Sequence, residues 1–283
     1  MSSDLSLRSL LSGSLLPPNE ARILMAHVLA QHYDLPRSAL LSRDDMALEG
    51  KALVHWKELE SKRLEGEPIA YLVGKRGFHS IELQVAPGVL IPRPETELLV
   101  EIGLKEVSLL TESKKTVKVL DLGTGSGAIA LALAHEAHNV FVTATDQSSD
   151  ALAIARSNAL DLKLENRVCF SQGSWYEALK EDDIFDIILS NPPYIATQDP
   201  HLTQGDLRFE PLSALTDHGT GLACLDAIIS GAKVHLRPNG LLAVEHGFDQ
   251  SDAVCELMRS AQFKDIQIHQ DLASHNRAVS GRK

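Results

Sequence analysis

The sequence predicts an α/β protein in which a small all-α domain and a β-hairpin precede an open, mostly parallel sheet with helices on both faces. Three observations support this fold class. Strand and helix patterns alternate from Val117 onward, apolar residues alternate within 76–91, and residues 1–75 carry only helical patterns. Regular alternation of strands and helices indicates a parallel sheet, because parallel neighbours need a crossover connection, usually a helix.

The first 75 residues are predicted to be helical. Apolar residues recur at helical spacing over Glu20–Gln31, and Asn19 occupies the position expected of an N-cap. A second helix is expected over Glu49–Glu65, where a glycine and a proline then end the pattern. These segments predict a small helical domain that carries none of the chemical motifs described below.

Residues 76–91 predict a β-hairpin that links two domains. Polar and apolar residues alternate over Phe78–Val85, and Ala86-Pro87-Gly88 has the composition of a turn before Val89–Ile91. A helix is expected next, over Glu95–Leu110, with a proline at its start and acidic residues in its first turn.

The remaining chain, within 92–283, is expected to form the sheet domain. Its predicted strands are Val117–Leu122, Val140–Asp146, Arg167–Ser171, Phe185–Ser190, Leu241–Glu245, Phe263–His269 and Arg277–Ser280. Its predicted helices are Ala128–His138, Ser148–Leu160, Gly221–Leu236 and Asp249–Ser260. The longest loop, Ile195–Leu215, directly follows a strand. Long loops at the carboxyl ends of parallel strands usually belong to the functional site.

Composition and charge exclude several classes of protein. Apolar residues make up 44% of the chain and charged residues 23%, values that exclude chain-wide disorder. No apolar run approaches the ~18 residues of a membrane-spanning helix, and Met1-Ser-Ser-Asp4 lacks the basic start of a signal peptide, so we expect a cytoplasmic protein. Residues 76–283 hold 18 basic and 28 acidic residues. Such a surface is a poor match for a phosphate backbone, so direct nucleic-acid binding is not expected.

The cysteines and histidines predict no metal site. The three cysteines are far apart and form no C-x-x-C pair, and the 12 histidines form no H-E-x-x-H motif. His135 and His138 stand three residues apart at the end of a predicted helix. We interpret them as cations near a helix C-terminus rather than as ligands.

A glycine-rich segment between the first predicted strand and its helix predicts a nucleotide-containing cofactor. In Asp121-Leu-Gly-Thr-Gly-Ser-Gly127 the small residues let the backbone approach a ligand, and the helix N-terminus offers free N–H groups. Asp146 ends the next strand, where a carboxylate can accept hydrogen bonds from both ribose hydroxyls. With Ala128 the segment also satisfies G-x-G-x-x-G/A, so by itself it leaves a nicotinamide cofactor open.

Asn191-Pro192-Pro193-Tyr194, directly after the strand Phe185–Ser190, predicts a site that orients a planar amino group. Each proline fixes φ and restricts the residue before it, so Asn191 is rigidly aimed and the Pro192 carbonyl faces outward. The Asn191 side-chain oxygen and that carbonyl can accept both hydrogens of an NH₂ group while Tyr194 lies against its π face. We expect the NH₂ of Asn191 itself to be tied to the scaffold or cofactor. The segment resembles the N/D-P-P-Y/F motif of amino-group methyltransferases that use S-adenosylmethionine.

The choice of substrate rests on a second resemblance. The segment Val89–Glu97, with the sequence Val-Leu-Ile-Pro-Arg-Pro-Glu-Thr-Glu, and Glu67–Gly74 before it are similar to the signature of the peptide chain release factor glutamine methyltransferases. Arg208–Leu215 and Asp271–Ala273 also resemble that family, and the resemblance extends over nearly the whole chain.

Three residues depart from the family pattern. Ser174, Gly77 and Thr220 stand where the family usually has Asp, Glu and Asp. The replacement at Ser174 removes an acceptor near the cofactor adenine. The other two positions belong to the hairpin and to the loop before a predicted helix, and none of the three belongs to the amide-binding motif.

The resemblance implies a fold, a reaction and a set of site residues. The fold is a class I S-adenosylmethionine-dependent methyltransferase domain, Rossmann-like with seven strands, over 92–283, preceded by a substrate-docking domain over 1–75 and the hairpin. The reaction is methyl transfer from S-adenosylmethionine to N5 of the glutamine in the Gly-Gly-Gln motif of class 1 release factors, by a monomer without a metal. The implied cofactor residues are Gly123, Thr124, Gly125, Ser126, Gly127, Asp146, Ser174, Trp175 and Asn191. The implied substrate residues are Asn191, Pro192, Pro193 and Tyr194, with Asn191, Pro192 and Tyr194 as the catalytic group.

Two other interpretations stay open. Nucleic-acid amino-methyltransferases use close relatives of the same motif, although the acidic residues 76–283 and the lack of a basic recognition domain disfavour this reading. A non-catalytic subunit that kept the cofactor fold is disfavoured by the intact segment Asn191–Tyr194. An assay with release factor beside DNA and tRNA separates the first alternative, and tight cofactor binding without turnover would indicate the second.

Overall fold

The computed structural model describes residues 5–111 and 114–283, and its contacts divide the chain into two compact units. The first unit comprises the chain up to Lys75 together with Gly205–Phe209, and the second comprises Arg76–Gln204 and Glu210–Lys283. The first unit has a core of its own, and the second has two. Within the described ranges, no helix has both the length and the apolar character needed to cross a bilayer.

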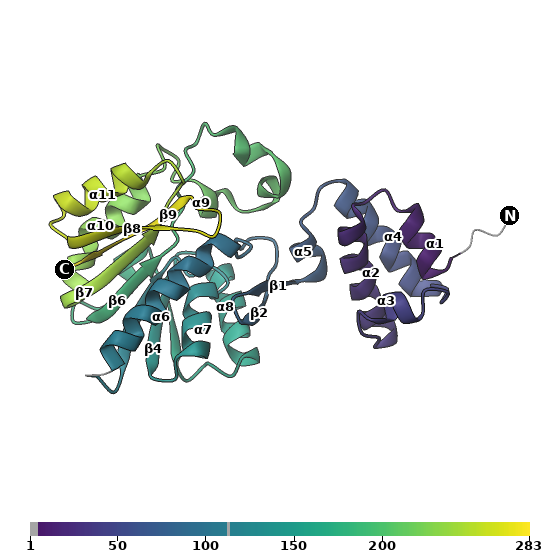
Figure 1. The fold of residues 1–283 in the computed structure, drawn as a ribbon, viewed down its shortest axis with the longest axis horizontal. Helices are drawn as coiled ribbons and strands as arrows, with labels where there is room; N and C mark the ends of the chain where they lie inside the picture. The colour runs from purple at the N-terminus through teal and green to yellow at the C-terminus, as the bar shows by residue number, and fades with distance from the viewer. Residues whose placement is uncertain (1–4, 112–113) are drawn as a thin grey trace. The chain divides into compact units, whose positions relative to one another are not determined.

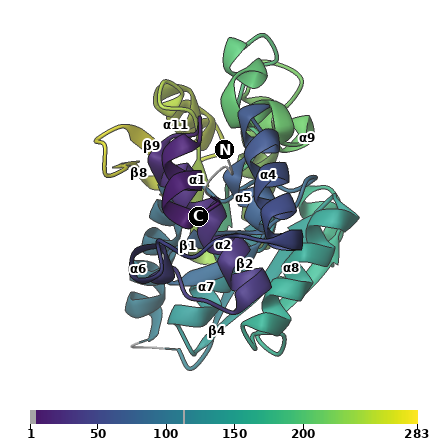
Figure 2. The ribbon, with the colours of Figure 1, turned by 90° about the vertical axis from the view of Figure 1, so that its right-hand side faces the viewer.

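The first unit is built from helices, as predicted (Figures 1 and 2). They are α1 (Leu7–Gly13), α2 (Pro18–Tyr33), α3 (Ala39–Ser42), α4 (Gly50–Leu64) and α5 (Ile69–Val73). Their core contains the fully buried Trp56 of α4, and Leu24, Met25 and Val28 of α2. The prediction of Asn19 as the N-cap of α2 is wrong. Pro17 holds that position and Pro18 is the first helical residue, because a fixed φ and a missing N–H suit the first turn.

A short helical segment far along the chain also belongs to the first unit. This is η4 (Gly205–Phe209), which lies in the long loop after β6 (Phe185–Ser190). The Nη1 atom of Arg63 donates to Oδ1 of Asp206 over 3.0 Å, and its Nε donates to Oε2 of Glu20 over 2.7 Å. These two carboxylates raise the pKa of Arg63. The ion pair with Asp206 joins η4 to α4, and the ion pair with Glu20 joins α2 to α4.

The predicted hairpin is present, but its turn is displaced. β1 (Lys75–Phe78) pairs with β2 (Ile81–Gln84), so the turn that joins these strands lies at His79 and Ser80. The predicted turn at Ala86-Pro87-Gly88 is present, with the N–H of Val89 donating to the carbonyl oxygen of Ala86 over 3.2 Å, but it follows β2 instead of joining the two strands. His79 has a positive φ of 52°. Its N–H donates to Oε1 of Glu97 over 2.9 Å, a contact between residues 18 positions apart that local composition does not reveal.

The segment Val89–Ile91, predicted as the second strand of the hairpin, does not form a strand. Its apolar side chains Val89 and Ile91 are buried. The N–H of Ile91 donates to Oε2 of Glu210 over 3.0 Å instead of to a neighbouring strand. The apolar pattern therefore reflects burial under another loop rather than strand pairing.

The second unit confirms the predicted open sheet. Its strands are β3 (Val117–Leu122), β4 (Val140–Asp146), β5 (Val168–Gln172), β6 (Phe185–Ser190), β7 (Leu236–Glu245), β8 (Lys264–Gln270) and β9 (Asn276–Arg282). Their spatial order is β5-β4-β3-β6-β7-β9-β8. The strands from β5 to β7 pair in parallel, and β9 is antiparallel to both β7 and β8.

Helices cover both faces of this sheet, with α6 and α7 on one face and α10 and α11 on the other (Figure 1). Successive residues of β6 divide between the two cores, because side chains of a strand alternate between faces. Ile187 and Leu189 join the first core and Ile188 the second. The helical elements are η1 (Pro94–Thr96), α6 (Glu97–Thr111), α7 (Ala128–Glu136), α8 (Ser149–Asp161), η2 (Trp175–Ala178), η3 (Pro200–Thr203), α9 (Leu212–Leu215), α10 (Ala223–His235) and α11 (Ser251–Ser260).

Helix α7 ends two residues before its predicted end. His135 lies in its last turn, while His138 lies beyond Glu136 and outside the helix. The interpretation of His135 as a residue of the helix C-terminus is confirmed, and the placement of His138 on the same helix is wrong. Among the residues that the structure describes, no group of three or more His, Cys, Asp or Glu side chains is arranged to hold a metal ion.

The order of the strands reverses beside β3. β4 and β5 extend the sheet to one side, and β6 and β7 extend it to the other. Leu122 at the end of β3 is in register with Ser190 at the end of β6, so the glycine-rich turn and Asn191 leave the sheet side by side. Such a reversal opens a crevice at the carboxyl ends of the strands, where open α/β sheets bind their ligands.

Candidate functional site

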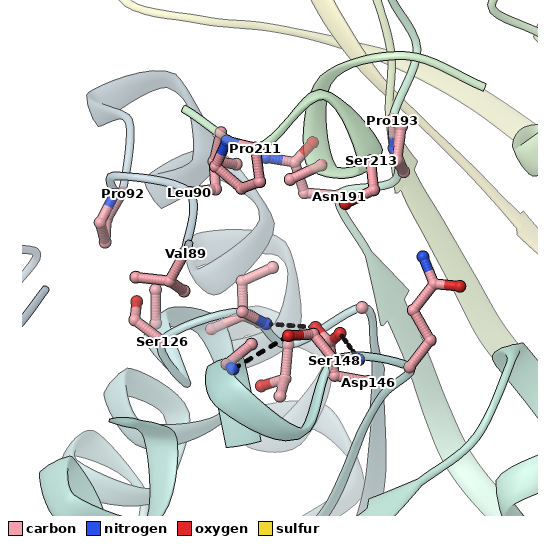
Figure 3. Close-up of a pocket in the computed structure, with 18 of the residues that line it drawn as sticks. Val89, Leu90, Pro92, Ser126, Asp146, Ser148, Asn191, Pro193, Pro211 and Ser213 are labelled. Atoms are coloured by element: carbon pink, nitrogen blue, oxygen red, sulfur yellow. Dashed lines mark hydrogen bonds between the residues drawn. The ribbon is translucent and has the colours of Figure 1, made fainter. Parts of the chain in front are cut away.

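A pocket lies at the carboxyl ends of β3, β4 and β6 (Figure 3). Asp146 and Ser148 border one side of it, and Asn191 and Ser213 border the opposite side in this view. The predicted site residues that line it are Gly123, Thr124, Gly125, Ser126, Asp146, Ser174, Trp175, Asn191 and Pro193. The topology thus brings together most of the residues that the sequence singled out.

Three predicted site residues do not line the pocket. Gly127 caps α7 with φ +88°, and a Cβ there would lie 2.8 Å from Cδ1 of Leu131, so this glycine serves the packing of the helix. Pro192 is buried between Asn191 and Pro193, which both line the pocket. The hydroxyl of Tyr194 donates to Oε1 of Glu245 over 3.1 Å.

The glycine-rich turn follows a left-handed backbone path. The φ angles are +71° at Gly123 and +56° at Gly125, in a region that residues with side chains rarely adopt. A Cβ at Gly123 would lie 3.4 Å from the Trp175 ring. The glycines therefore keep an open cradle at the N-terminus of α7, where backbone N–H groups lack helical partners.

Asp121, fully buried beneath this turn, holds it to α7. Its Oδ2 accepts from Oγ1 of Thr124 over 2.6 Å and from the N–H of Ala130 over 3.2 Å. Burial raises the pKa of Asp121 to about 7, against the opposing effect of these hydrogen bonds. These hydrogen bonds to Asp121 hold the glycine-rich turn in place without a ligand.

Asp146 presents its carboxylate to the pocket from the end of β4 (Figure 3). Oδ2 accepts from the N–H of Gly125 and Oδ1 from the N–H of Ser148, both over 2.9 Å. Burial raises the pKa of Asp146, and these backbone hydrogen bonds lower it. A carboxylate offers about four acceptor positions, and the backbone N–H groups of Gly125, Ser148 and Gln147 do not fill them all, so Asp146 can still accept from ligand hydroxyls.

The side-chain amide of Asn191 is held by one hydrogen bond. Its Nδ2 donates to Oγ1 of Thr96 over 2.9 Å. The NH₂ end is therefore tied to the scaffold, as the sequence led us to expect. The other end of the amide, Oδ1, is the end that can accept a hydrogen bond from a ligand.

Two of the segments that carry the family resemblance, Val89–Glu97 and Glu210–Leu215, contact each other at the pocket. Arg93 forms an ion pair with Oε1 of Glu210, whose side chain is fully buried and whose Oε2 accepts from the N–H of Ile91. Arg93, Pro211 and Ser213 line the pocket. The pair gives the Pro-Arg-Pro and Arg-Phe-Glu-Pro segments a shared structural role, which the sequence analysis did not assign.

Sequence reasoning missed Thr96 and Glu245. Thr96 lines the pocket, and Glu245 stands behind it at the end of β7, 1% exposed. Burial raises the pKa of Glu245 to about 7, and the neighbouring hydroxyls of Thr96 and Tyr194 lower it. One signal was present: Glu245 ends a strand beside β6, as Asp146 ends a strand on the other side of β3.

The pocket fits a ligand that contains a nucleoside. Asp146 offers a carboxylate for vicinal hydroxyls, and the glycine turn offers a cradle that a Cβ would narrow. The Trp175 ring borders this cradle and provides an apolar surface for a planar base. Ser174 offers only a hydroxyl beside it.

Comparison with known proteins gives matches over almost the whole chain. Residues 113–278 match the family model described as a methyltransferase domain, and residues 7–74 match the one described as the PrmC N-terminal domain. A release factor glutamine methyltransferase from Bordetella pertussis is 46% identical over 275 residues, which cover 97% of this chain and 98% of that protein. A protein of the same name from Xylella fastidiosa (strain Temecula1) is 47% identical over 263 residues, 93% of this chain and 92% of that protein.

Solved structures of methyltransferases share the fold. The 16S rRNA N2 G1207 methyltransferase of T. thermophilus, in complex with AdoMet and guanosine, has a TM-score of 0.54 at 21% identity, over 74% of this chain and 49% of that chain. A methyltransferase from Pyrococcus furiosus has a TM-score of 0.54 at 17% identity, over 80% of this chain and 98% of that chain. At such identities the likeness concerns the fold alone.

Proposed function

This chain belongs to the release factor glutamine methyltransferase family, and we propose that it methylates N5 of the glutamine in the Gly-Gly-Gln motif of class 1 release factors. One observation carries the proposal: Asn191 stands in the same pocket as Asp146, with its NH₂ end tied to Thr96. The choice of a protein rather than a nucleic acid as substrate is supported by near-full-length relatives and by the excess of acidic residues over 76–283.

S-adenosylmethionine is the proposed ligand of the pocket. When bound, it supplies an electrophilic methyl group on a sulfonium centre. The residues proposed to hold it are those of the glycine-rich turn from Gly123 to Gly127, Asp146, Ser174, Trp175 and Asn191. Asp146 would accept from the ribose hydroxyls, and Gly127 would act through the shape of the turn rather than by contact.

The task of the chain in this reaction is mostly placement. An amide nitrogen is a poor nucleophile because its lone pair is delocalised. Asn191 Oδ1 and the Pro192 carbonyl would each accept one hydrogen of the glutamine NH₂, and the Tyr194 ring would limit its motion. Orientation of this kind contributes up to ~7–11 kcal/mol in well-aligned reactions. The same two acceptors stabilise the positive charge that grows on nitrogen in the transition state.

Mass spectrometry of the release factor tests the function. After incubation with the protein and S-adenosylmethionine, we expect one added methyl group on the glutamine of the Gly-Gly-Gln peptide. A release factor with alanine at that glutamine serves as the control and should stay unmodified. Methylation of DNA or tRNA in parallel reactions, with an unmodified release factor, would contradict the proposal.

Residues 1–75 are proposed to dock the release factor, in a monomeric protein of the cytoplasm. The helical unit has its own core and contains none of the pocket residues. A variant that begins at Lys75 should keep its affinity for S-adenosylmethionine and its activity on a short Gly-Gly-Gln peptide. Its kcat/KM on the whole release factor should fall about tenfold or more, because a lost contact surface worth ~1.4 kcal/mol has that effect.

Peptide activity is the control in this experiment. Because Gly205–Phe209 packs with the helical unit, a loss of activity on the peptide as well would point to damage at the pocket rather than lost docking. Undiminished kcat/KM on the whole release factor would refute the docking role.

A further inference from the structure

A buried polar cluster lies behind the amide-binding motif. Glu245 at the end of β7 is 1% exposed, and Thr96 in η1 is 4% exposed. The Tyr194 hydroxyl donates to Oε1 of Glu245 over 3.1 Å, while the other carboxyl oxygen, Oε2, is buried without a hydrogen-bond partner of ordinary geometry among the described residues. The Thr96 side chain lies near enough to this carboxyl group to favour its charged form. Thr96 in turn accepts from Nδ2 of Asn191 over 2.9 Å. The cluster therefore reaches both ends of the motif from Asn191 to Tyr194.

The chemistry of these groups sets the direction of each hydrogen bond. An ionised carboxylate can only accept, so the Thr96 hydroxyl turns its proton toward Oε2 of Glu245, which is otherwise unpartnered among the described residues. The Thr96 oxygen is then left to accept, and its partner must be the NH₂ end of Asn191. This order turns Oδ1 of Asn191 away from Thr96. A neutral or donating group in place of Glu245 would let the Thr96 hydroxyl donate to Asn191 instead, which favours the opposite amide orientation.

We infer that Glu245 is a positioning residue for methyl transfer: through the Thr96 hydroxyl it fixes which end of the Asn191 amide meets the substrate, and through the Tyr194 hydroxyl it holds the other end of the motif. The inference rests on the proposed amide methylation. Glu245 does not line the pocket, so it acts on the substrate only through Thr96, Asn191 and Tyr194.

Burial raises the pKa of Glu245 to about 7, so its charge changes near neutral pH. Arg277 on β9 favours the charged form, and Glu95 in η1 disfavours it, while Tyr194 contributes a neutral hydroxyl. Since the positioning role needs the carboxylate, kcat should rise with pH as Glu245 loses its proton. Its effect on stability has the opposite sign, because a carboxyl pKa raised on folding stabilises at low pH and this contribution is lost as pH rises through about 7.

The first test compares two buried carboxylates as amides. Glu245→Gln keeps the volume but introduces a donor, and we expect kcat on the release factor to fall about tenfold, the effect of one net hydrogen bond. The dissociation constant for S-adenosylmethionine should stay unchanged. Asp186→Asn is the matched control, because Asp186 is equally buried at the far end of β6 and pairs there with Lys114. This variant should lose stability but keep the wild-type kcat.

The second test addresses the relay through Thr96. Thr96→Val keeps the shape without the hydroxyl and should lower kcat about as much as Glu245→Gln. Thr96→Ser restores the hydroxyl and should recover most of the activity. The double variant Glu245→Gln with Thr96→Val should be little worse than either single one, because both break one chain of hydrogen bonds. If Glu245→Gln does not fold, the comparison of Thr96→Val with Thr96→Ser still tests the inference.

The pH profile separates positioning from a merely structural role. Asp121 also has a pKa of about 7, so the profile of Glu245→Gln must be compared with that of the wild type. We expect the rise of kcat near neutral pH to be reduced in this variant. Wild-type kcat in both Glu245→Gln and Thr96→Val would overturn the inference. A wild-type protein that methylates no glutamine would instead overturn the proposed function.

Discussion

Replacing Asn191 with alanine is expected to lower kcat for methyl transfer by about 10²–10³, the effect of losing one preorganised polar partner in better-studied sites. The substitution removes the oxygen that accepts from the substrate amide and releases the nucleophile from its orientation. It also leaves the Thr96 hydroxyl without the amide that now donates to it. Steady-state kinetics with release factor as substrate measures the effect.

Cofactor binding serves as the internal control for this variant. The glycine-rich turn and Asp146 provide most of the proposed contacts, so the dissociation constant for S-adenosylmethionine should change much less than kcat. Asn191→Asp is the sharper comparison, because it keeps an acceptor oxygen and nearly the same shape. It should retain more activity than Asn191→Ala. Near wild-type kcat in Asn191→Ala would mean that this residue is only part of a turn.

Replacing Asp146 with alanine should weaken binding of S-adenosylmethionine by about 10- to 150-fold, because hydrogen bonds to a charged group contribute ~1.5–3 kcal/mol. The variant has no carboxylate to accept from the two ligand hydroxyls. The N–H groups of Gly125 and Ser148 would also lose the acceptor to which they donate in the structure. Titration calorimetry measures the dissociation constant directly.

Asp146→Asn separates these two contributions. The amide keeps one acceptor oxygen and the shape of the side chain, so part of the network at Gly125 or Ser148 survives. Its affinity should lie between those of the wild type and Asp146→Ala. Circular dichroism should show an intact fold in both variants. An unchanged dissociation constant in Asp146→Ala would contradict its assignment to the ribose.

The elements that were predicted well are those whose residues form a recognisable pattern within a short stretch of sequence. Buried strands such as Phe185–Ser190 are continuous apolar runs that end at polar or turn residues, and β6 matches that prediction at both ends. The glycine turn and Asn191 were placed correctly because each follows such a strand directly, and parallel strands bring their carboxyl ends to one edge. The pocket thus follows from strand order plus two short motifs.

What could not be predicted depends on contacts between distant parts of the chain. Arg93 and Glu210 are 117 residues apart, and only their pairing shows why Val89–Ile91 is buried without being a strand. The hairpin turn at His79 depends on a carboxylate from α6. Glu245 had no assigned role in sequence because its partners lie on η1 and on the loop after β6.

The close approach of Trp175 to the glycine turn gives the protein an optical reporter of its pocket. The chain has two tryptophans. Trp56 is sealed in the core of the helical unit, whereas Trp175 lines the pocket with its ring 3.4 Å from the position of a Cβ on Gly123. Emission from Trp56 is therefore a constant background, and emission from Trp175 responds to whatever occupies the cradle. With Trp56→Phe, which keeps an aromatic side chain in that core but removes its indole, the remaining fluorescence comes from Trp175 alone, so ligand occupancy can be followed in real time without any label.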